Sequence, residues 1–125
     1  MYCRNYNRNR GGDVKRNVSK GDVPVLIMAV LAEAPSHGYA IAREIERRSG
    51  AQLGVKEGTL YPALRVLEQS GLIEGKWQTP ESGPARKVYV LTVAGHGELE
   101  RRARSWNDYA RAVGRALGGD DAQHA

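Results

Sequence analysis

Cysteine, histidine and long apolar runs are all scarce in this chain of 125 residues. The only cysteine is Cys3, and the three histidines, His37, His96 and His124, lie far apart in the sequence. This pattern predicts neither a disulfide framework nor a metal site built from Cys and His, and it gives no sign of an oxidising compartment. We expect no cofactor and no metal ligand.

The longest apolar run is VPVLIMAVLA, over residues 23–32. It is about half of the roughly 20 residues that a membrane-spanning helix needs. The charged segment in front of it lacks the apolar region of a signal peptide. We therefore expect no membrane span and a cytoplasmic protein.

Catalytic motifs are missing as well. The sequence has no histidine-anchored nucleophile, no glycine-rich loop that would cradle a phosphate, and no carboxylate pair in a readable setting. We therefore expect a protein that is not an enzyme and has no catalytic residues.

Positive charge, by contrast, is in excess, with a net charge of +5 and a pI near 9.6. Residues 1–22 hold six Arg or Lys against two Asp and have no apolar periodicity, which predicts a disordered basic arm. This arm is either a minor-groove contact or a flexible extension that adds only non-specific attraction, and we favour the second. Residues 118–125 read as a flexible tail. The excess charge suits a nucleic-acid partner or an anionic surface, although a mildly basic solvated surface is the ordinary alternative.

The stretch between these ends predicts four helices and one hairpin from apolar spacing, capping residues and turn residues. The helices are expected over residues 23–34, 36–50, 56–70 and 92–117, and the strands over 72–78 and 86–92. Three helices with a tight turn between the second and third, followed by a two-stranded hairpin, form the layout of a winged helix-turn-helix. Residues 23–91 are therefore predicted to be a DNA-binding domain.

The third predicted helix begins with residues that weaken helices. Gly58 and Pro62 lie within the apolar pattern of Leu60, Leu64 and Leu67, although a glycine inside a helix costs about 1 kcal/mol and a proline about 3. In a helix-turn-helix this end enters the major groove, where bare backbone and the positive end of the helix dipole meet phosphate oxygens. Pro62 would leave the Gly58 carbonyl without its usual donor and loosen the first turn.

Polar residues around this turn are candidate DNA contacts. Thr59 and Tyr61 carry hydroxyl groups that can donate to phosphate. Lys56 and Arg65 lie on the face opposite the leucines and could reach a phosphate or a guanine edge. A simpler interpretation is a kinked turn packed against a neighbour, with Tyr61 as a core aromatic.

The hairpin tip, ESGPARK, adds Arg86 and Lys87 beside a Gly-Pro turn. This suits a wing that lies along the DNA backbone or minor groove, and an ordinary solvated hairpin end is the alternative. Because both features occur in one chain, we favour the DNA-binding interpretation. The candidate DNA-binding set is Lys56, Gly58, Thr59, Tyr61, Pro62, Arg65, Gly83, Arg86 and Lys87.

An apolar seam runs along the last predicted helix, residues 92–117, at alternating spacings of four and three residues. Its members are Leu99, Ala103, Trp106, Ala110, Val113 and Leu117. Residues 93–117 would make a rod of about 37 Å, longer than the roughly 28 Å diameter expected for the 70-residue core before it. Part of the seam must be covered from elsewhere, so we expect a homodimer that pairs this helix with its two-fold copy.

Trp106 lies midway along this seam between two small residues and has two interpretations. It lines a slot into which a flat aromatic ligand inserts, or it fills its own space as an anchor of the dimer interface. We favour the second interpretation. The expected fold is thus mainly α with a small β-hairpin, a winged helix-turn-helix followed by a long C-terminal dimerisation helix.

Three motifs carry a resemblance to a known family. HGYAIAREI at 37–45, GTLYPALRVLEQSGLI at 58–73 and GPARKVYVLTVAG at 83–95 are together similar to the PadR family of bacterial transcriptional regulators, especially its shorter members with a single C-terminal helix. The resemblance covers about residues 24–117. It implies a homodimeric winged-helix protein that binds palindromic operator DNA, usually as a repressor, and is released by a small molecule or stress signal.

The same resemblance implies residue roles, and here the chain departs from the usual pattern. Thr59, Tyr61, Arg65 and the two wing cations would contact DNA, and the last helix would form the dimer. Many members have a small capping residue before the glycine, whereas this chain has Lys56 and Glu57. Glu57 suits the helix dipole but repels phosphate, so it must point away from DNA or accept from a cytosine amino group. A winged-helix module that binds protein or RNA, without sequence-specific DNA binding, is the alternative function.

Overall fold

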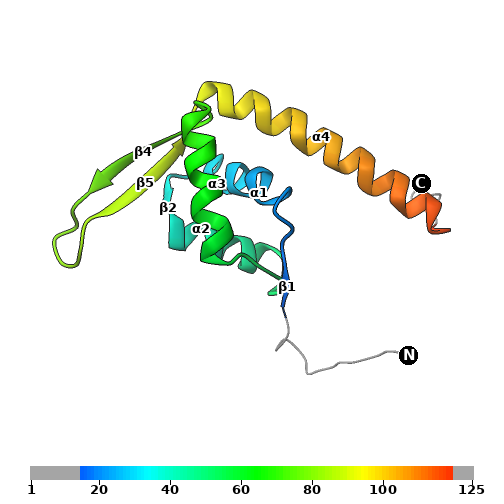
Figure 1. Ribbon diagram of the computed structural model, residues 1–125, viewed down its shortest axis with the longest axis horizontal. Coiled ribbons are helices and arrows are strands. Elements are labelled where there is room, and N and C mark those ends of the chain that lie inside the picture. The colour runs from blue at the N-terminus through cyan, green and yellow to red at the C-terminus, as the bar shows by residue number, and fades with distance from the viewer. Residues whose placement is uncertain (1–14, 120–125) are drawn as a thin grey trace.

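The apolar faces predicted for the first three helices meet in one core. In this computed structural model, which describes residues 15–119, the helices are α1 (Val23–Leu31), α2 (Gly38–Arg48), α3 (Glu57–Gln69) and α4 (Val93–Ala116). Ile27 of α1, Ile41 of α2 and Leu64 of α3 are almost completely buried, together with Ile73 at the base of the hairpin. The expected mainly α fold with a winged helix-turn-helix layout is confirmed (Figure 1).

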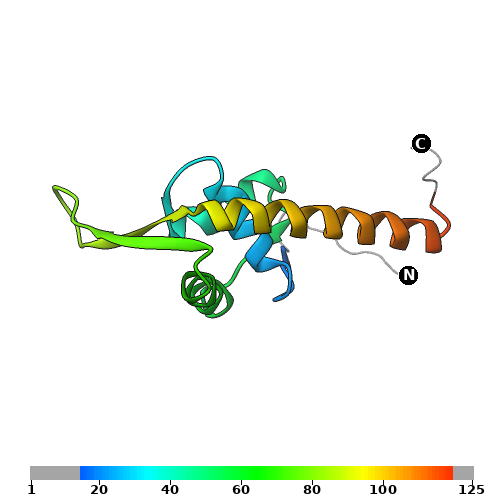
Figure 2. The ribbon, with the colours of Figure 1, turned by 90° about the horizontal axis from the view of Figure 1, so that it is seen from above.

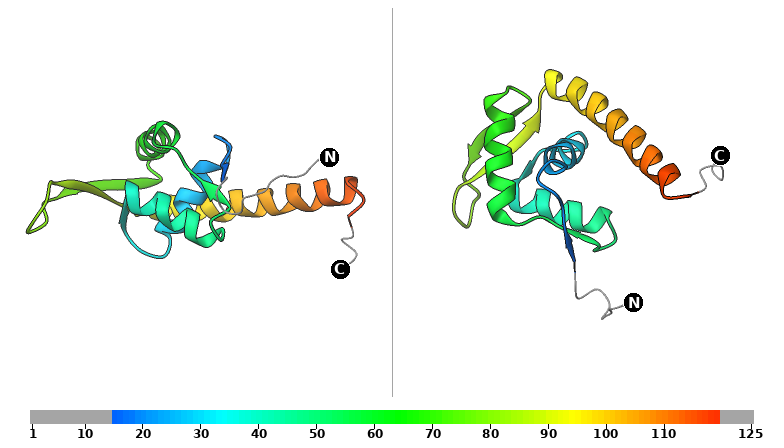
Figure 3. Two further views of the ribbon diagram at one scale, coloured as in Figure 1. Left: turned by 90° about the horizontal axis from the view of Figure 1, so that it is seen from below. Right: turned by 45° about the vertical axis from the view of Figure 1, so that its right-hand side comes forward.

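The hairpin consists of β4 (Ile73–Gln78) and β5 (Arg86–Leu91), paired in antiparallel register from Ile73 opposite Leu91 to Gln78 opposite Arg86. It extends to one side of the helical core while α4 extends to the other (Figure 2). Two further views show α1 between α3 and α4, so the first helix is the shared support of the other two (Figure 3).

A third strand at the start of α2 was not predicted. Ser36 and His37 form β2 (Ser36–His37), which pairs with Tyr89 and Val88 of β5. The second helix therefore begins at Gly38 and not at residue 36. The first helix also ends three residues before the predicted end, at Leu31, and Ala32 is its C-cap. The proline at position 35 disfavours helical backbone at residue 34 only.

Residues 15–22, the part of the predicted basic arm that the structure describes, are ordered. β1 (Arg16–Asn17) pairs in parallel with β3 (Leu53–Gly54), in the turn that precedes α3. The Lys15 ammonium forms an ion pair with Glu46 at 2.6 Å, and the Val18 N–H donates to the Gly54 carbonyl at 3.0 Å. Residues 15–22 are thus part of the folded domain, which corrects the prediction for this part of the arm. Residues 1–14, and residues 120–125 of the predicted tail, lie outside the described residues.

The first turn of α4 is fixed on the base of the hairpin. Thr92 caps the helix: its hydroxyl accepts from the Gly95 N–H at 3.0 Å and donates to the Gly71 carbonyl at 2.8 Å. A Cβ at Gly95 would lie 2.1 Å from the Leu72 carbonyl oxygen, so only glycine allows this close approach. The direction in which α4 leaves the core is therefore set by backbone contact.

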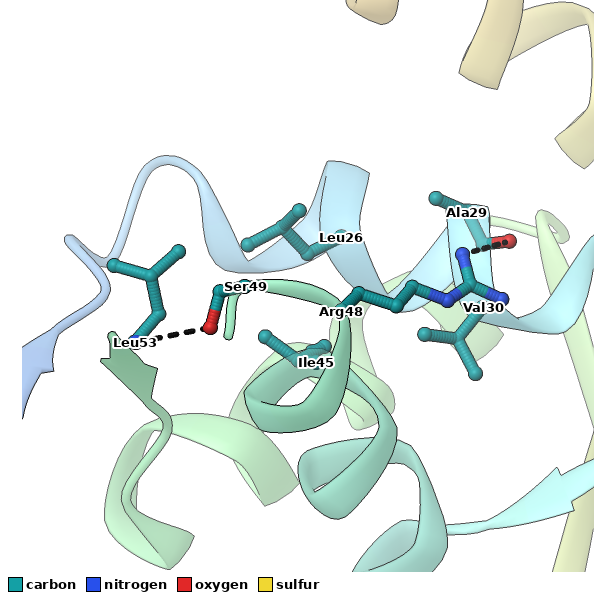
Figure 4. A pocket seen from close by; sticks show the side chains of 7 residues that line it. All are labelled: Leu26, Ala29, Val30, Ile45, Arg48, Ser49 and Leu53. Carbon is teal, nitrogen blue, oxygen red and sulfur yellow. Dashed lines mark hydrogen bonds between the residues drawn. The ribbon is translucent and has the colours of Figure 1, made fainter. Parts of the chain in front are cut away.

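Residues of α1, of the end of α2 and of β3 surround a small pocket, with polar contacts at its edge (Figure 4). The Arg48 guanidinium donates to the Ala29 carbonyl, and the Ser49 hydroxyl accepts from the Leu53 N–H at 3.0 Å. The enclosed volume, about 160 Å³, is below the range of about 300–1,000 Å³ usual for ligand sites. This pocket is a packing feature of the helix pair.

Within residues 15–119 no helix is both long and apolar enough to cross a membrane. In the same described part of the chain, no three His, Cys, Asp or Glu side chains lie together in a way that could hold a metal ion.

Candidate nucleic-acid interface

The N-terminal end of α3 carries no side-chain cap. Lys56 occupies the capping position in extended conformation, and its carbonyl accepts from the N–H groups of Thr59 and Leu60 at 2.9 and 2.8 Å, but its own side chain caps nothing. Glu57, the first residue of the helix, is exposed. An uncapped helix start with exposed backbone is the arrangement that binds anions.

Gly58 lies in this exposed first turn and is not required by the fold. A Cβ built at this position meets no atom within 4 Å, and its φ is not positive. Three other glycines differ from it, since a Cβ at Gly38, Gly75 or Gly95 would lie 2.8, 2.6 or 2.1 Å from its nearest neighbour. Nothing within the described chain therefore explains why residue 58 lacks a side chain.

The α3 helix continues through Pro62, which is exposed. Tyr61 is 42% exposed and is not a core aromatic. Its ring lies against Gly38, since a Cβ there would come within 2.8 Å of the Tyr61 ring and hydroxyl. Tyr61 thus fills the junction between the starts of α2 and α3 and keeps part of its surface in solvent.

Arg65 is exposed on α3, one turn beyond Tyr61. On the hairpin, Gly83 takes a positive φ of 102° in the turn, and Arg86 is exposed at the start of β5. Lys87 is placed differently, because its ammonium already donates to the Glu68 carboxylate at 2.9 Å. This hydrogen bond raises the pKa of Lys87. The contact between Lys87 and DNA therefore stays a prediction. To bind phosphate, the ammonium group of Lys87 would have to leave Glu68.

Residues at the start of α2 join this surface and were missed as site residues. Tyr39 is exposed, and the Arg43 guanidinium lies 5.7 Å from the centre of its ring. His37 pairs with Val88, two residues along β5 from Arg86, which places the hairpin cation close to the start of α2. Burial and this nearby arginine both lower the pKa of His37. The motif HGY was visible in the sequence. The first helix of a helix-turn-helix crosses the DNA backbone, and that rule could have singled out its exposed tyrosine.

Other cations of α2 are held by acidic neighbours. Glu44 accepts from both Arg47 and Arg48, and these hydrogen bonds lower its pKa to about 2. Arg48 also pairs with Glu33 at 2.8 Å. The positive surface at this side is therefore carried mainly by Arg43 and the α3 and hairpin residues.

The predicted dimerisation seam changes character along α4. Leu99 packs against the core, Ala103 is half-buried and Trp106 is 45% exposed. Towards the C-terminal end Val113 is exposed, and Leu117 is 81% exposed. The structure thus joins the first part of the seam to the domain and leaves the last part without cover in the described chain.

A groove of about 570 Å³ lies beside this seam. It is bounded by α1, by the segment around β1 and by α4, and its lining is mostly apolar. The principal apolar lining residues are Val18, Val25, Leu26, Leu53, Leu99 and Trp106. Its volume is within the usual range for small-molecule sites.

Comparison with known proteins identifies the architecture. The model of the family described as Transcriptional regulator PadR-like family matches residues 27–101. A transcriptional regulator of Mycobacterium tuberculosis, Rv3488, is 35% identical over 83% of this chain and 91% of its own length. An uncharacterised protein in a transposon of Streptomyces fradiae is 43% identical over 77% of this chain, which spans only 25% of that longer protein. The crystal structure of a PadR family transcription regulator from Clostridium difficile is 33% identical, with a TM-score of 0.66 over 79% of this chain and 100% of the other.

Proposed function

The chain belongs to the PadR-like family of transcriptional regulators, and from that premise we propose that it is a homodimeric DNA-binding regulator that represses transcription from a palindromic operator. In this proposal α3 enters the major groove and the β4–β5 hairpin, the wing, lies beside it. A regulator of this kind works where the chromosome is, so we also propose a cytoplasmic location.

Gly58 is the observation that carries the DNA proposal. A glycine in a helix costs up to about 1 kcal/mol relative to alanine, and no contact in the described chain requires one at position 58. An external surface that approaches the helix backbone would require it. The uncapped N–H groups beside Gly58 suit a phosphate, because they carry the positive end of the helix dipole.

The charges around Gly58 support the same partner. Lys56, Arg65 and Arg86 are all exposed cations on α3 and the wing, and Thr59 adds a hydroxyl. Glu57 is the exception, and we propose that it points past the phosphates or accepts from a cytosine amino group. Cations around an open helix start fit a polyanion better than they fit an apolar protein surface.

The first test measures binding to a duplex that carries the region upstream of its own gene, by mobility shift at several salt concentrations. Arg65→Ala and Arg86→Ala should each weaken binding, by roughly 5- to 100-fold for each half-site where the arginine reads a base. Where it contacts phosphate, each should reduce the slope of log affinity against log salt by about 1.8, that is about 0.9 for each subunit of the dimer.

Arg104→Ala, which removes an exposed cation from α4, is the matched control and should leave both quantities unchanged. Equal affinity for this duplex, a random duplex and an RNA hairpin would support the alternative of a nucleic-acid or protein module without operator specificity.

The second test separates stability from binding at Gly58. Gly58→Ala should raise the free energy of unfolding by up to about 1 kcal/mol in urea titrations, since alanine favours the helix. It should also weaken operator binding, since a methyl group then stands between backbone and DNA. Gly97→Ala on α4 is the control, because a Cβ there also meets nothing within 4 Å. It should stabilise the protein and leave binding unaltered. A Gly58→Ala protein with wild-type affinity would remove the main support for the proposal.

The homodimer is proposed from the uncovered half of α4. The helix has 24 residues, about 36 Å at 1.5 Å per residue, and only its first part packs on the core. Ala110, Val113 and Leu117 continue the seam, the last two of them exposed. A second copy of α4, related by a two-fold axis, would cover this stripe, and the same axis would place two α3 helices on the two halves of a palindrome.

A charge in the seam tests the dimer. Val113→Glu should place an unpaired carboxylate in the interface, halve the mass measured by light scattering and abolish tight operator binding. Ala112→Glu adds the same charge one residue away, on the outer face, and should keep both the mass and the binding. A wild-type protein that is already monomeric at micromolar concentration would contradict this proposal.

An aromatic effector is proposed for the groove beside Trp106. The groove is apolar, about 570 Å³ in volume, and offers a partly exposed indole for stacking. A flat ligand held between Trp106 and Leu26 would displace α4 from α1, and because α4 carries the dimer seam, this would change the separation of the two α3 helices.

The chain has two tryptophans, so a Trp77→Phe variant leaves Trp106 as the only indole reporter. Planar aromatic compounds should quench its fluorescence and lower operator affinity in parallel, and Trp106→Ala should abolish the effect on affinity. If no such compound at millimolar concentration changes the fluorescence, Trp106 only packs in the interface.

A further inference from the structure

Glu68, in the last turn of α3, joins the helix to both strands of the wing. Its Oε1 accepts from the Lys87 ammonium of β5 at 2.9 Å, and its Oε2 accepts from the Gly75 N–H of β4 at 3.3 Å. Both side chains of the Glu68–Lys87 pair keep only about a third of their surface exposed, 32% and 30%. One carboxylate therefore fastens the wing to α3.

The absence of a side chain at Gly75 leaves room for this ion pair. Lys87 lies opposite Trp77 in the strand register, so its side chain must cross β4 at residue 75 to reach Glu68. A Cβ at Gly75 would lie 2.6 Å from Lys87 Cε and 2.9 Å from the ring of Tyr89. The Lys87 ammonium also lies 5.6 Å from the centre of the Tyr89 ring, which is itself almost buried. Gly75, Tyr89 and Glu68 thus surround the Lys87 side chain and fix its direction.

We propose that the Glu68–Lys87 pair is a positioning device that fixes the angle between the wing and α3 and withholds Lys87 from DNA. The inference rests on the proposed DNA-binding function and revises one of its contacts. The wing and α3 meet the duplex at two places, so the angle between them decides which base pairs the wing reaches. A wing held at one angle discriminates between sequences better than one that can swing.

Two substitutions and their combination test this role. Lys87→Met keeps the length of the side chain and removes the charge, and Glu68→Gln keeps the shape and removes the charge. Lys87→Met should lower the ratio of operator to random-duplex affinity by about fivefold, within the coupling range of residues in contact, and leave the salt slope at the wild-type value.

Glu68→Gln should lower the same ratio, tighten binding to random duplex and steepen the salt slope by about 1.8, because the released Lys87 of each subunit then neutralises one more phosphate. The double variant should return the slope to the wild-type value while the ratio stays low. Arg86→Ala, which should reduce the slope, shows that the assay detects wing contacts.

A slope reduced by about 1.8 in Lys87→Met would mean that Lys87 of each subunit contacts phosphate in the native complex, and would overturn the withholding role. An unchanged affinity ratio in all three variants would overturn the positioning role.

The fluorescence of Trp77 tests the device without DNA. Trp77 is 70% exposed and stands directly opposite Lys87, and in a Trp106→Phe background it is the only indole. Glu68→Gln should lower its fluorescence anisotropy, because the outer part of the wing, beyond the residues that pair with β2, is then held less firmly. An unchanged anisotropy would overturn the proposal. If the anisotropy falls but no duplex binds even the wild-type protein, the Glu68–Lys87 pair does hold the wing, and the proposed DNA-binding function is wrong.

Discussion

Burial of the leucine face of α3 is the interaction on which the interface depends. Leu60, Leu64 and Leu67 are each at most 2% exposed, and burying a leucine contributes about 1.5–3 kcal/mol. Three of them outweigh the cost of about 4 kcal/mol that Gly58 and Pro62 impose on the helix. The inner face thus keeps α3 helical and in place. The residues of its outer face and first turn are not needed for folding and can serve the contact with a partner.

The main helices and the hairpin could be predicted because each carries its own periodic pattern. The two-residue strands could not, because no period is visible in two residues and their pairing is non-local. Ser36 pairs with Tyr89, more than fifty positions away, and Arg16 pairs with Leu53. The ordered end of the basic arm was missed for the same reason, since its composition is polar and its support comes from backbone hydrogen bonds to β3.

The candidate site was predictable to a similar extent. Gly58 and Pro62 stand out because they contradict the helix around them, and that contradiction is local in sequence. The partner of Lys87 is not local: Glu68 lies 19 residues earlier, on another element. From the sequence a cation near a turn looks available for phosphate, and only the packing of the wing against α3 shows that its charge is already engaged.

One joint connects the parts that the proposed regulator must coordinate. The Leu72 carbonyl, three residues after α3 ends, accepts from the Thr92 N–H at 3.1 Å and faces Gly95 of α4 at a distance that excludes any side chain. The end of α3, the base of the wing and the start of α4 therefore share one contact. Tightly packed backbone transmits displacement better than it absorbs it. In the proposed dimer, a movement of α4 in its groove would consequently turn α3 and the wing together about this joint, which gives a ligand beside Trp106 a direct mechanical route to the DNA surface.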